Sequence, residues 1–199
     1  MTIARQLWVL AGGNGAGKST FYRLFLEKQG IKLINADLIA KQIDAHNPEA
    51  VSYDAATVAE YLRHDLLAQG LSFCFETVFS HPSKIDFLAR AKALGYEVIL
   101  IFIHLADSRL NEARVHQRVQ EGGHNVPAEK IRSRIPRTLR HIATVLPLVD
   151  QARLLDNTFH DQYFRQVAVL KHGHLVWKAA SVPDWAHLLL AGICAERPQ

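Results

Sequence analysis

The chain has 199 residues, 49% of them hydrophobic, and a formal net charge of +4. This is enough for one globular domain over 1–199 with a full core, without disulfides or structural metals. The two cysteines, Cys74 and Cys194, lie far apart, which fits reduced thiols better than a disulfide framework. The longest apolar stretch, Val98 to Ile103, is too short for a membrane span, and no signal peptide fits before Leu7. We therefore expect a cytoplasmic protein with no membrane partner.

Short apolar runs of strand length alternate with longer segments of helical period. This pattern is typical of an α/β domain with a mostly parallel sheet flanked by helices. Several of the runs are apolar throughout, as strands buried on both faces should be. The predicted strands are Leu7–Ala11, Lys32–Asn35, Ser72–Glu76, Glu97–His104 and Arg153–Leu155.

Three helices are predicted among these strands, over Lys18–Lys28, over Ala50–Gln69, and between Pro82 and Gly95. The second of them carries apolar residues at spacings of three and four, which indicates one buried face. Those residues are Val51, Ala55, Val58, Leu62 and Leu66.

A helical pattern from about 107 to 148 is interrupted at Glu121–Pro127 and again at Pro136, where a proline must kink or restart the helix. We expect a helix–loop–helix excursion here. Farther on, Gln166–Lys178 alternates around a His-Gly-His turn, which predicts a hairpin. A closing helix is predicted over Val182–Ala191.

Positive charge is concentrated in the excursion. Between Arg109 and Arg140 there are seven arginines and one lysine against three glutamates, a net charge of +5. The basicity of the chain is therefore one local feature. Such a cluster can contact nucleic acid, or it can contact the phosphates of ATP and of a small substrate.

The segment from Gly12 to Ser19, GGNGAGKS, has the full P-loop (Walker A) pattern between a predicted strand and a predicted helix. Its backbone amides and the helix N-terminus can surround phosphate oxygens, Lys18 can reach the outer phosphates, and Ser19 can ligate magnesium. The sequence therefore predicts binding of ATP with Mg²⁺. The predicted nucleotide contacts are Gly12, Gly13, Asn14, Gly15, Ala16, Gly17, Lys18, Ser19 and Thr20.

Asp37 lies just past the second predicted strand, at the edge where parallel sheets bind ligands. In a small-molecule kinase a carboxylate at this place can accept the proton of the attacked hydroxyl. The alternative is that Asp37 only caps the helix that begins at Leu38, which aspartate does well. Spacing alone leaves both interpretations open.

Glu76 ends the third apolar run, where an acidic residue can hold magnesium through water or bind substrate. A merely solvated charge at the end of a strand is the alternative. Thr77 follows on the same edge and is a weaker candidate for substrate contact.

The excursion supplies candidate phosphate ligands. Arg114 and Arg118 are four residues apart and share one helical face, and Arg134 lies on the next predicted helix. Arginines on a mobile flap can neutralise a transferring phosphoryl group, and Gly122 and Gly123 supply a flexible joint. Solvated helix charges are the alternative.

Two loop residues complete the candidates. His124 stands among glycines and is a candidate ligand contact. Asn157 follows the last predicted parallel strand, near the expected position of the adenine base, and it could instead simply form a turn.

These motifs resemble, in the right order over roughly residues 7 to 158, the zeta-toxin-like family of P-loop kinases, in particular the bacterial zeta-like branch often labelled only as a predicted ATPase. The segments that carry the resemblance are Gly12–Ser19, Asn35-Ala36-Asp37, Phe75-Glu76-Thr77, and Arg114 to Arg118 with Gly122–Pro127. It implies a P-loop nucleoside-triphosphate hydrolase fold with a five-stranded parallel core sheet, like that of shikimate or adenylate kinase, and an arginine-bearing lid.

The resemblance also implies chemistry. Characterised zeta toxins phosphorylate a hydroxyl of UDP-N-acetylglucosamine, with an aspartate base that matches Asp37, a P-loop lysine that matches Lys18, and lid arginines. A substrate or magnesium role for Glu76 and a neighbouring antitoxin protein are implied as well. The spacing of the lid arginines differs from that of the characterised toxins, and His124 stands where a phosphate-binding arginine is expected.

We therefore predict an ATP-dependent kinase acting on a hydroxyl of a small metabolite. Its catalytic residues would be Asp37, Lys18, Arg114, Arg118 and Arg134. One alternative is a nucleotide-dependent ATPase or switch, although no LSGGQ-like motif is present. Another is a nucleic-acid 5′-hydroxyl kinase, but no aromatic-rich surface accompanies the arginines for base stacking.

Overall fold

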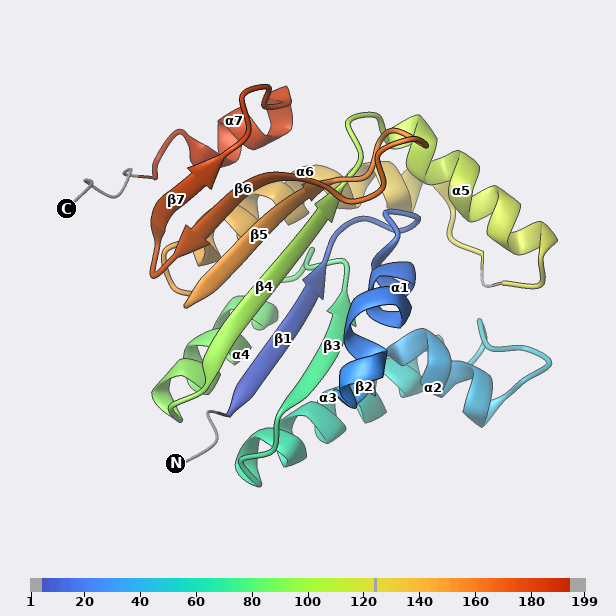
Figure 1. Ribbon diagram of the computed structural model, residues 1–199. Coiled ribbons are helices and arrows are strands. Elements are labelled where there is room, and N and C mark those ends of the chain that lie inside the picture. The colour runs from blue at the N-terminus through green and yellow to red at the C-terminus, as the bar shows by residue number, and fades with distance from the viewer. Residues whose placement is uncertain (1–4, 124, 194–199) are drawn as a thin grey trace.

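The computed structural model describes residues 5–123 and 125–193. A seven-stranded sheet in the order β2-β3-β1-β4-β5-β6-β7 forms its centre (Figure 1). The strands are β1 (Gln6–Ala11), β2 (Leu33–Ile34), β3 (Phe73–Thr77), β4 (Glu97–His104), β5 (Gln151–Asp156), β6 (Arg165–Lys171) and β7 (His174–Lys178). The first five are parallel, and β6 and β7 pair antiparallel.

The predicted α/β architecture, its five parallel strands and the C-terminal hairpin are confirmed. A separate five-stranded core is only approximately matched, because the hairpin bonds to β5 and extends the same sheet. The physical reason is the short connection between β5 and β6, which has no crossover helix and can therefore join only antiparallel strands.

Helices connect the parallel strands, and a last helix follows β7. They are α1 (Lys18–Phe21), α2 (Ala36–Ile43), α3 (Ser52–Ala68), α4 (Ser83–Ala93), α5 (Ser108–Gln120), α6 (Ala128–Val145) and α7 (Asp184–Leu190). A π-helical turn (η1, Tyr22–Leu26) and a 3₁₀ turn (η2, Glu27–Gln29) continue α1. The expected excursion corresponds to α5 and α6. A restart at Pro136 is wrong, since α6 continues through it and residues on both sides, Ile131 and Ile142, are buried against the rest of the protein.

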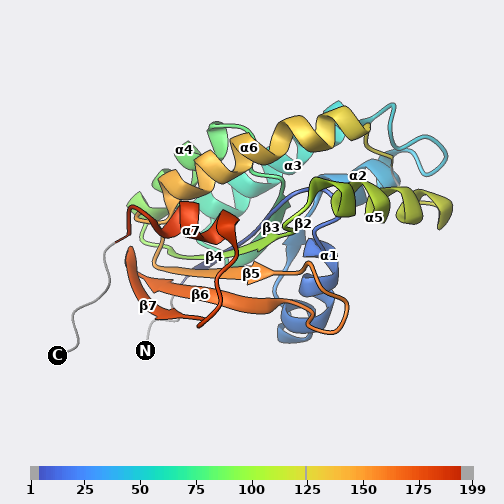
Figure 2. The same ribbon diagram turned by 90° about the horizontal axis from the view of Figure 1, so that it is seen from above.

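The helices lie in two layers on the sheet. Figure 2 shows α3, α4, α6 and α7 on one face and α1 on the other. The central strand β4 alternates between them: Val98, Leu100 and Phe102 enter the larger core under the four helices, and the intervening isoleucines enter the smaller core under α1. A central strand buried on both faces explains why this run is apolar throughout.

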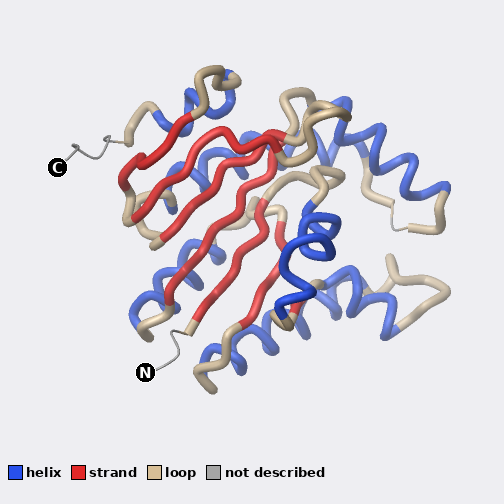
Figure 3. Tube along the Cα trace, viewed as in Figure 1, coloured by secondary structure: helices blue, strands red, loops and turns tan. Residues whose placement is uncertain are grey.

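The carboxyl ends of the parallel strands meet at one edge of the sheet. Figure 3 shows the loops that follow β1 and β4 at this edge, with α5 and α2 extending beyond it.

Cys74 is buried in the smaller core, and burial raises the pKa of its thiol, so it is no nucleophile. Over the described ranges, no helix is both long and apolar enough to cross a membrane. One domain over 1–199 stays a prediction, and Cys194 lies outside the described residues.

Candidate active site

The P-loop lies at this edge, and its glycines are required by its geometry. Gly12 has φ +149° and Gly17 has φ +103°, both in the region that favours glycine. A Cβ atom on Gly12 would lie 2.1 Å from the Ile103 carbonyl oxygen, and one on Gly17 would lie 2.6 Å from Asn157 Nδ2. Any larger residue at these two positions would therefore displace the loop from its neighbours.

Two buried asparagines hold the loop from either side. Asn111 Nδ2 on α5 donates to the Asn14 carbonyl at 2.7 Å, and Asn157 Nδ2 donates to the Ala16 carbonyl at 2.9 Å. Asn157 Oδ1 also accepts from the Phe164 amide at 3.2 Å. These bonds show Asn157 supporting the P-loop, and its adenine contact stays a prediction. The sequence analysis missed Asn111, whose signal is its place four residues before the buried Val115.

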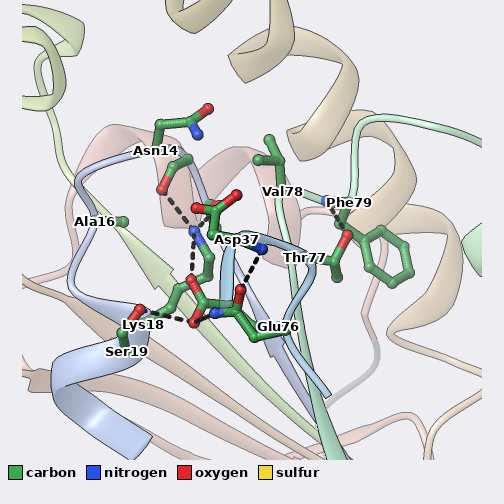
Figure 4. A network of polar contacts seen from close by, with 12 residues as sticks. Asn14, Ala16, Lys18, Ser19, Asp37, Glu76, Thr77, Val78 and Phe79 are labelled. Carbon is green, nitrogen blue, oxygen red and sulfur yellow. Dashed lines mark hydrogen bonds and ion pairs between the residues drawn. The ribbon is translucent and has the colours of Figure 1, made fainter. Parts of the chain in front are cut away.

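Lys18 is buried at the mouth of the loop. Its ammonium donates to the carbonyls of Gly12 and Gly13 at 2.8 and 2.9 Å and lies 3.7 Å from Glu76 Oε1 (Figure 4). Burial lowers the pKa of Lys18 and the charge of Arg118 lowers it further, whereas Glu76 and Asp37 oppose the shift. A cation is thus fixed where the loop turns.

Glu76 joins the P-loop to the neighbouring strands. Its Oε2 accepts from Ser19 Oγ at 2.8 Å and from Asn35 Nδ2 at 2.7 Å. The parallel register places Glu76 beside Leu10 of β1, directly before the loop. A hydroxyl and a carboxylate oxygen that converge in this way are ligands of the kind Mg²⁺ prefers. In the part of the chain that the structure describes, no cluster of three His, Cys, Asp or Glu offers an all-protein metal site.

Asp37 lies in the first turn of α2 but does not cap it. Asn35 Oδ1 accepts from the amides of Asp37 and Leu38 at 2.8 and 3.3 Å, so Asn35 is the cap and the capping interpretation of Asp37 is wrong. The reason is that α2 begins earlier than the sequence suggested, at Ala36. The Asp37 carboxylate is exposed and lies beside the Lys18 ammonium (Figure 4).

A cleft of about 630 Å³ opens in front of these residues. The P-loop, the start of α2, one side of α3, the β3–α4 connection and the start of α6 line it. Lys18, Asp37, Glu76 and Thr77 all face this space, so predicted donor and acceptor residues share one cleft. The Thr77 hydroxyl also accepts from the Phe79 amide at 2.9 Å.

The three lid arginines surround the P-loop but do not all line the cleft. Arg134 lines it and donates to Asn14 Oδ1 at 3.4 Å. Arg114 donates to the Asn157 carbonyl at 2.9 Å, and Arg118 lies near enough to affect the pKa of Lys18. Thr20 is exposed on α1, and His124 lies outside the described residues.

The sequence analysis also missed Arg63 of α3, which is buried and lines the same cleft. The predicted apolar face of this helix was partly wrong, because Val58 is 39% exposed. The buried residues are Ala55, Ala59, Arg63, Leu66 and Leu67. The available signal is that Arg63 falls four residues after Ala59 on that face.

Comparison with known proteins gives concordant findings. Residues 3–170 match the Zeta toxin family. An uncharacterised Haemophilus influenzae protein is 33% identical over 139 residues, which cover 66% of this chain and 99% of that protein.

Solved structures are similar over most or all of the chain. The AvrRxo1-ORF1:-ORF2 complex with ATP has a TM-score of 0.71 at 20% identity, covering 100% of this chain and 66% of that chain. A structure of the PezAT toxin–antitoxin system of Streptococcus pneumoniae has a TM-score of 0.66 at 19% identity, with coverages of 100% and 81%. A Chloroflexus aurantiacus structure described as a putative kinase has a TM-score of 0.60 at 17% identity, covering 80% and 91%. At these identities the likeness shows a common fold.

Proposed function

Because this chain belongs to the zeta toxin family, we propose that it is an ATP-dependent kinase that transfers the γ-phosphoryl group to a hydroxyl of a small metabolite. One observation carries the proposal: the P-loop lysine Lys18 and the exposed carboxylate of Asp37 face the same cleft. A nucleotide switch needs the first of these residues but not the second. The volume of the cleft, about 630 Å³, is in the range of small-molecule sites.

The donor nucleotide would lie on the P-loop. Its amides and Lys18 would bind the phosphates, while Ser19 and Glu76 would hold Mg²⁺. Bound Mg²⁺ supplies charge neutralisation on the phosphate oxygens. Glu76 fits this role because it already accepts from the Ser19 hydroxyl and lies 3.7 Å from the Lys18 ammonium.

The acceptor hydroxyl would lie against Asp37. Its oxygen attacks the γ-phosphorus while its proton passes to the Asp37 carboxylate, and the bond from the γ-phosphorus to the β–γ bridging oxygen breaks, so that ADP leaves. Arg134 lines the cleft and would neutralise charge on the transferring group. Arg114 and Arg118 would act from the side of α5, and Thr77 would contact the acceptor. His124 stays a candidate contact.

Family membership makes a UDP-N-acetyl sugar, and UDP-N-acetylglucosamine in particular, our first candidate acceptor. We also propose a cytoplasmic location and an antitoxin-type protein partner. The partner proposal is supported by the similarity to PezAT, which is described as a toxin–antitoxin system, and to AvrRxo1-ORF1, which was solved with ORF2. The alternatives remain an ATPase switch without an acceptor and a nucleic-acid 5′-hydroxyl kinase.

The test is label transfer from γ-labelled ATP to a panel of UDP-sugars, other hydroxyl metabolites and 5′-hydroxyl oligonucleotides. We expect label in a small acceptor only when Lys18 and Asp37 are both intact. Hydrolysis that is insensitive to Asp37→Asn, with no labelled acceptor, would instead identify a switch. Labelled oligonucleotide would identify the nucleic-acid kinase.

A further inference from the structure

Arg63 is a buried cation with little compensation inside the protein. Its residue is 6% exposed, and its guanidinium carbon lies 5.3 Å from the ring centre of Phe75 and 5.7 Å from that of Phe87. Among the residues that the structure describes, its Nε has no hydrogen-bond partner, and the carboxylate paired with it, that of Glu60, is 4.0 Å away and 53% exposed. Burial lowers the pKa of Arg63, yet a guanidinium stays charged at neutral pH. A charge held this way is costly to bury.

A second cation lies near it. Lys84, half-buried at the start of α4, donates to Ser83 Oγ at 3.3 Å. Burial lowers the pKa of Lys84, the charge of Arg63 lowers it further, and Glu60 opposes the shift. Two cations are therefore close enough to repel each other, and the largely exposed Glu60 carboxylate offsets this repulsion only in part. Folding alone does not explain this arrangement, because an apolar residue on the two phenyl rings would pack without the desolvation penalty.

Both cations line the cleft that contains Asp37. In the described part of the chain the Arg63 guanidinium makes no hydrogen bond, and Lys84 donates only to Ser83 Oγ. Both side chains can therefore donate to a ligand that enters the cleft, and arginine suits planar or tetrahedral oxyanions. We propose that Arg63 and Lys84 form an anion subsite for the acceptor, so that the kinase prefers a hydroxyl compound that also carries a carboxylate or phosphate group. That the bound anion belongs to the phosphate acceptor rests on the proposed function, but anion binding by Arg63 and Lys84 can be tested without it.

The first test measures kcat/KM for matched acceptors. N-acetylglucosamine is compared with its 1-phosphate and with UDP-N-acetylglucosamine, and glucose is compared with gluconate, so that phosphate and carboxylate are separate arms. In Arg63→Met we expect the anionic-to-neutral ratio of kcat/KM to fall by about 10- to 150-fold, the loss of one or two charged hydrogen bonds. Lys84→Met should lower it by about 3- to 10-fold. Lys41→Met, an exposed lysine of α2 outside the cleft, should leave the ratio unchanged.

The second test measures binding without transfer. Inorganic phosphate is titrated calorimetrically into protein saturated with Mg²⁺ and a non-hydrolysable ATP analogue, which occupies the P-loop. The affinity should fall about tenfold or more in Arg63→Met. Methionine keeps the long apolar stem on Phe75 and Phe87, and thermal denaturation verifies the fold. Lys84→Met repeats the test at a less buried position.

The outcomes separate the two proposals. Phosphate binding that depends on Arg63 and Lys84, without phosphorylation of any acceptor, would support the anion subsite and contradict the proposed kinase activity. Phosphoryl transfer with an unchanged anionic-to-neutral ratio of kcat/KM in both variants would support the kinase activity and overturn the anion subsite. Equal losses for neutral and anionic acceptors, with unchanged phosphate affinity, would show that Arg63 only packs on the rings and would also overturn it.

Discussion

The two halves of the cleft are built differently. The proposed donor half is the P-loop, which is held by side-chain hydrogen bonds with Glu76, Asn111 and Asn157, and its cation Lys18 has three partners in the described part of the chain. In the proposed acceptor half, Asp37 is exposed and the Arg63 guanidinium makes no hydrogen bond to the described part of the chain.

The difference suits the two ligands that we propose for the cleft. Triphosphate is the same in every P-loop protein, so a fixed cradle of amides and one lysine is sufficient, and preorganisation lowers the cost of binding. An acceptor differs from one enzyme to another, and the Arg63 guanidinium, which we propose contacts it, makes no hydrogen bond to the residues that the structure describes. The following predictions test this division, beginning with the largest effect.

Asp37→Asn should lower phosphoryl transfer strongly while leaving ATP binding nearly unchanged. An amide cannot accept the hydroxyl proton, so phosphoryl transfer should fall by about 10²- to 10⁴-fold. Affinity for ATP should change by less than about threefold, because the donor half binds it. Single-turnover transfer and fluorescent-nucleotide binding measure the two quantities. Wild-type transfer to an identified acceptor would show that Asp37 is not the base.

Glu76→Gln should change the donor half alone. Removing the carboxylate charge next to Ser19 should raise the Mg²⁺ concentration for half-maximal transfer by about 10- to 100-fold. Titration of Mg²⁺ at saturating ATP measures it. Glu60→Gln, an acidic residue of the acceptor half, is the matched control and should leave that concentration where it was. If both variants shift it equally, the division between the halves is wrong.

Asn157→Ala should loosen the P-loop without altering the acceptor side. Loss of its bonds to Ala16 and Phe164 leaves buried backbone groups unsatisfied, at about 1–3 kcal/mol. We expect KM for ATP to rise about tenfold and Tm to fall by roughly 2–8 °C. Gln162→Ala, an exposed residue of the same loop, should do neither. An unchanged KM for ATP would remove Asn157 from the support of the loop.

His104→Phe should affect stability only. Burial lowers the pKa of His104 to about 4, and the charge of Asp156 opposes the shift. The unfolded chain, with a histidine pKa of about 6.5, therefore takes up this proton first as the pH falls, so stability is full above about 6.5 and declines toward 4. At pH 5 the loss should be about 2 kcal/mol.

Phenylalanine should remove that loss, since it packs between Phe102 and Trp185 without titrating. Urea unfolding of wild type and variant at pH 7 and pH 5 measures the difference. Transfer at pH 7.5 should be unchanged, because His104 does not line the cleft. An equal pH dependence in the two proteins would assign the acid sensitivity to another group.

Much of the donor half was readable from the sequence. The P-loop is eight consecutive residues with an apolar strand before it and a helical pattern after it, and the five parallel strands were found from their apolar runs. These features depend on neighbours in the chain, and backbone sterics and apolar periodicity act locally. The resemblance to zeta toxins rested on the same short segments, and the family match confirms it.

The acceptor half was decided by tertiary packing. Asn35 rather than Asp37 caps α2, because the helix begins at Ala36, two residues earlier than expected, where Asn35 can also donate to Glu76. The buried face of α3 contains Ala59 and Arg63 in place of the predicted Val58. This rotation of the helix is what brings Arg63 to the cleft. Helix rotation and helix start depend on contacts between segments far apart in the chain. The sequence by itself thus predicted the P-loop and Asp37, whereas only the folded structure brought Arg63 and Lys84 to the same cleft, because that depends on how α3 and α4 pack on the sheet.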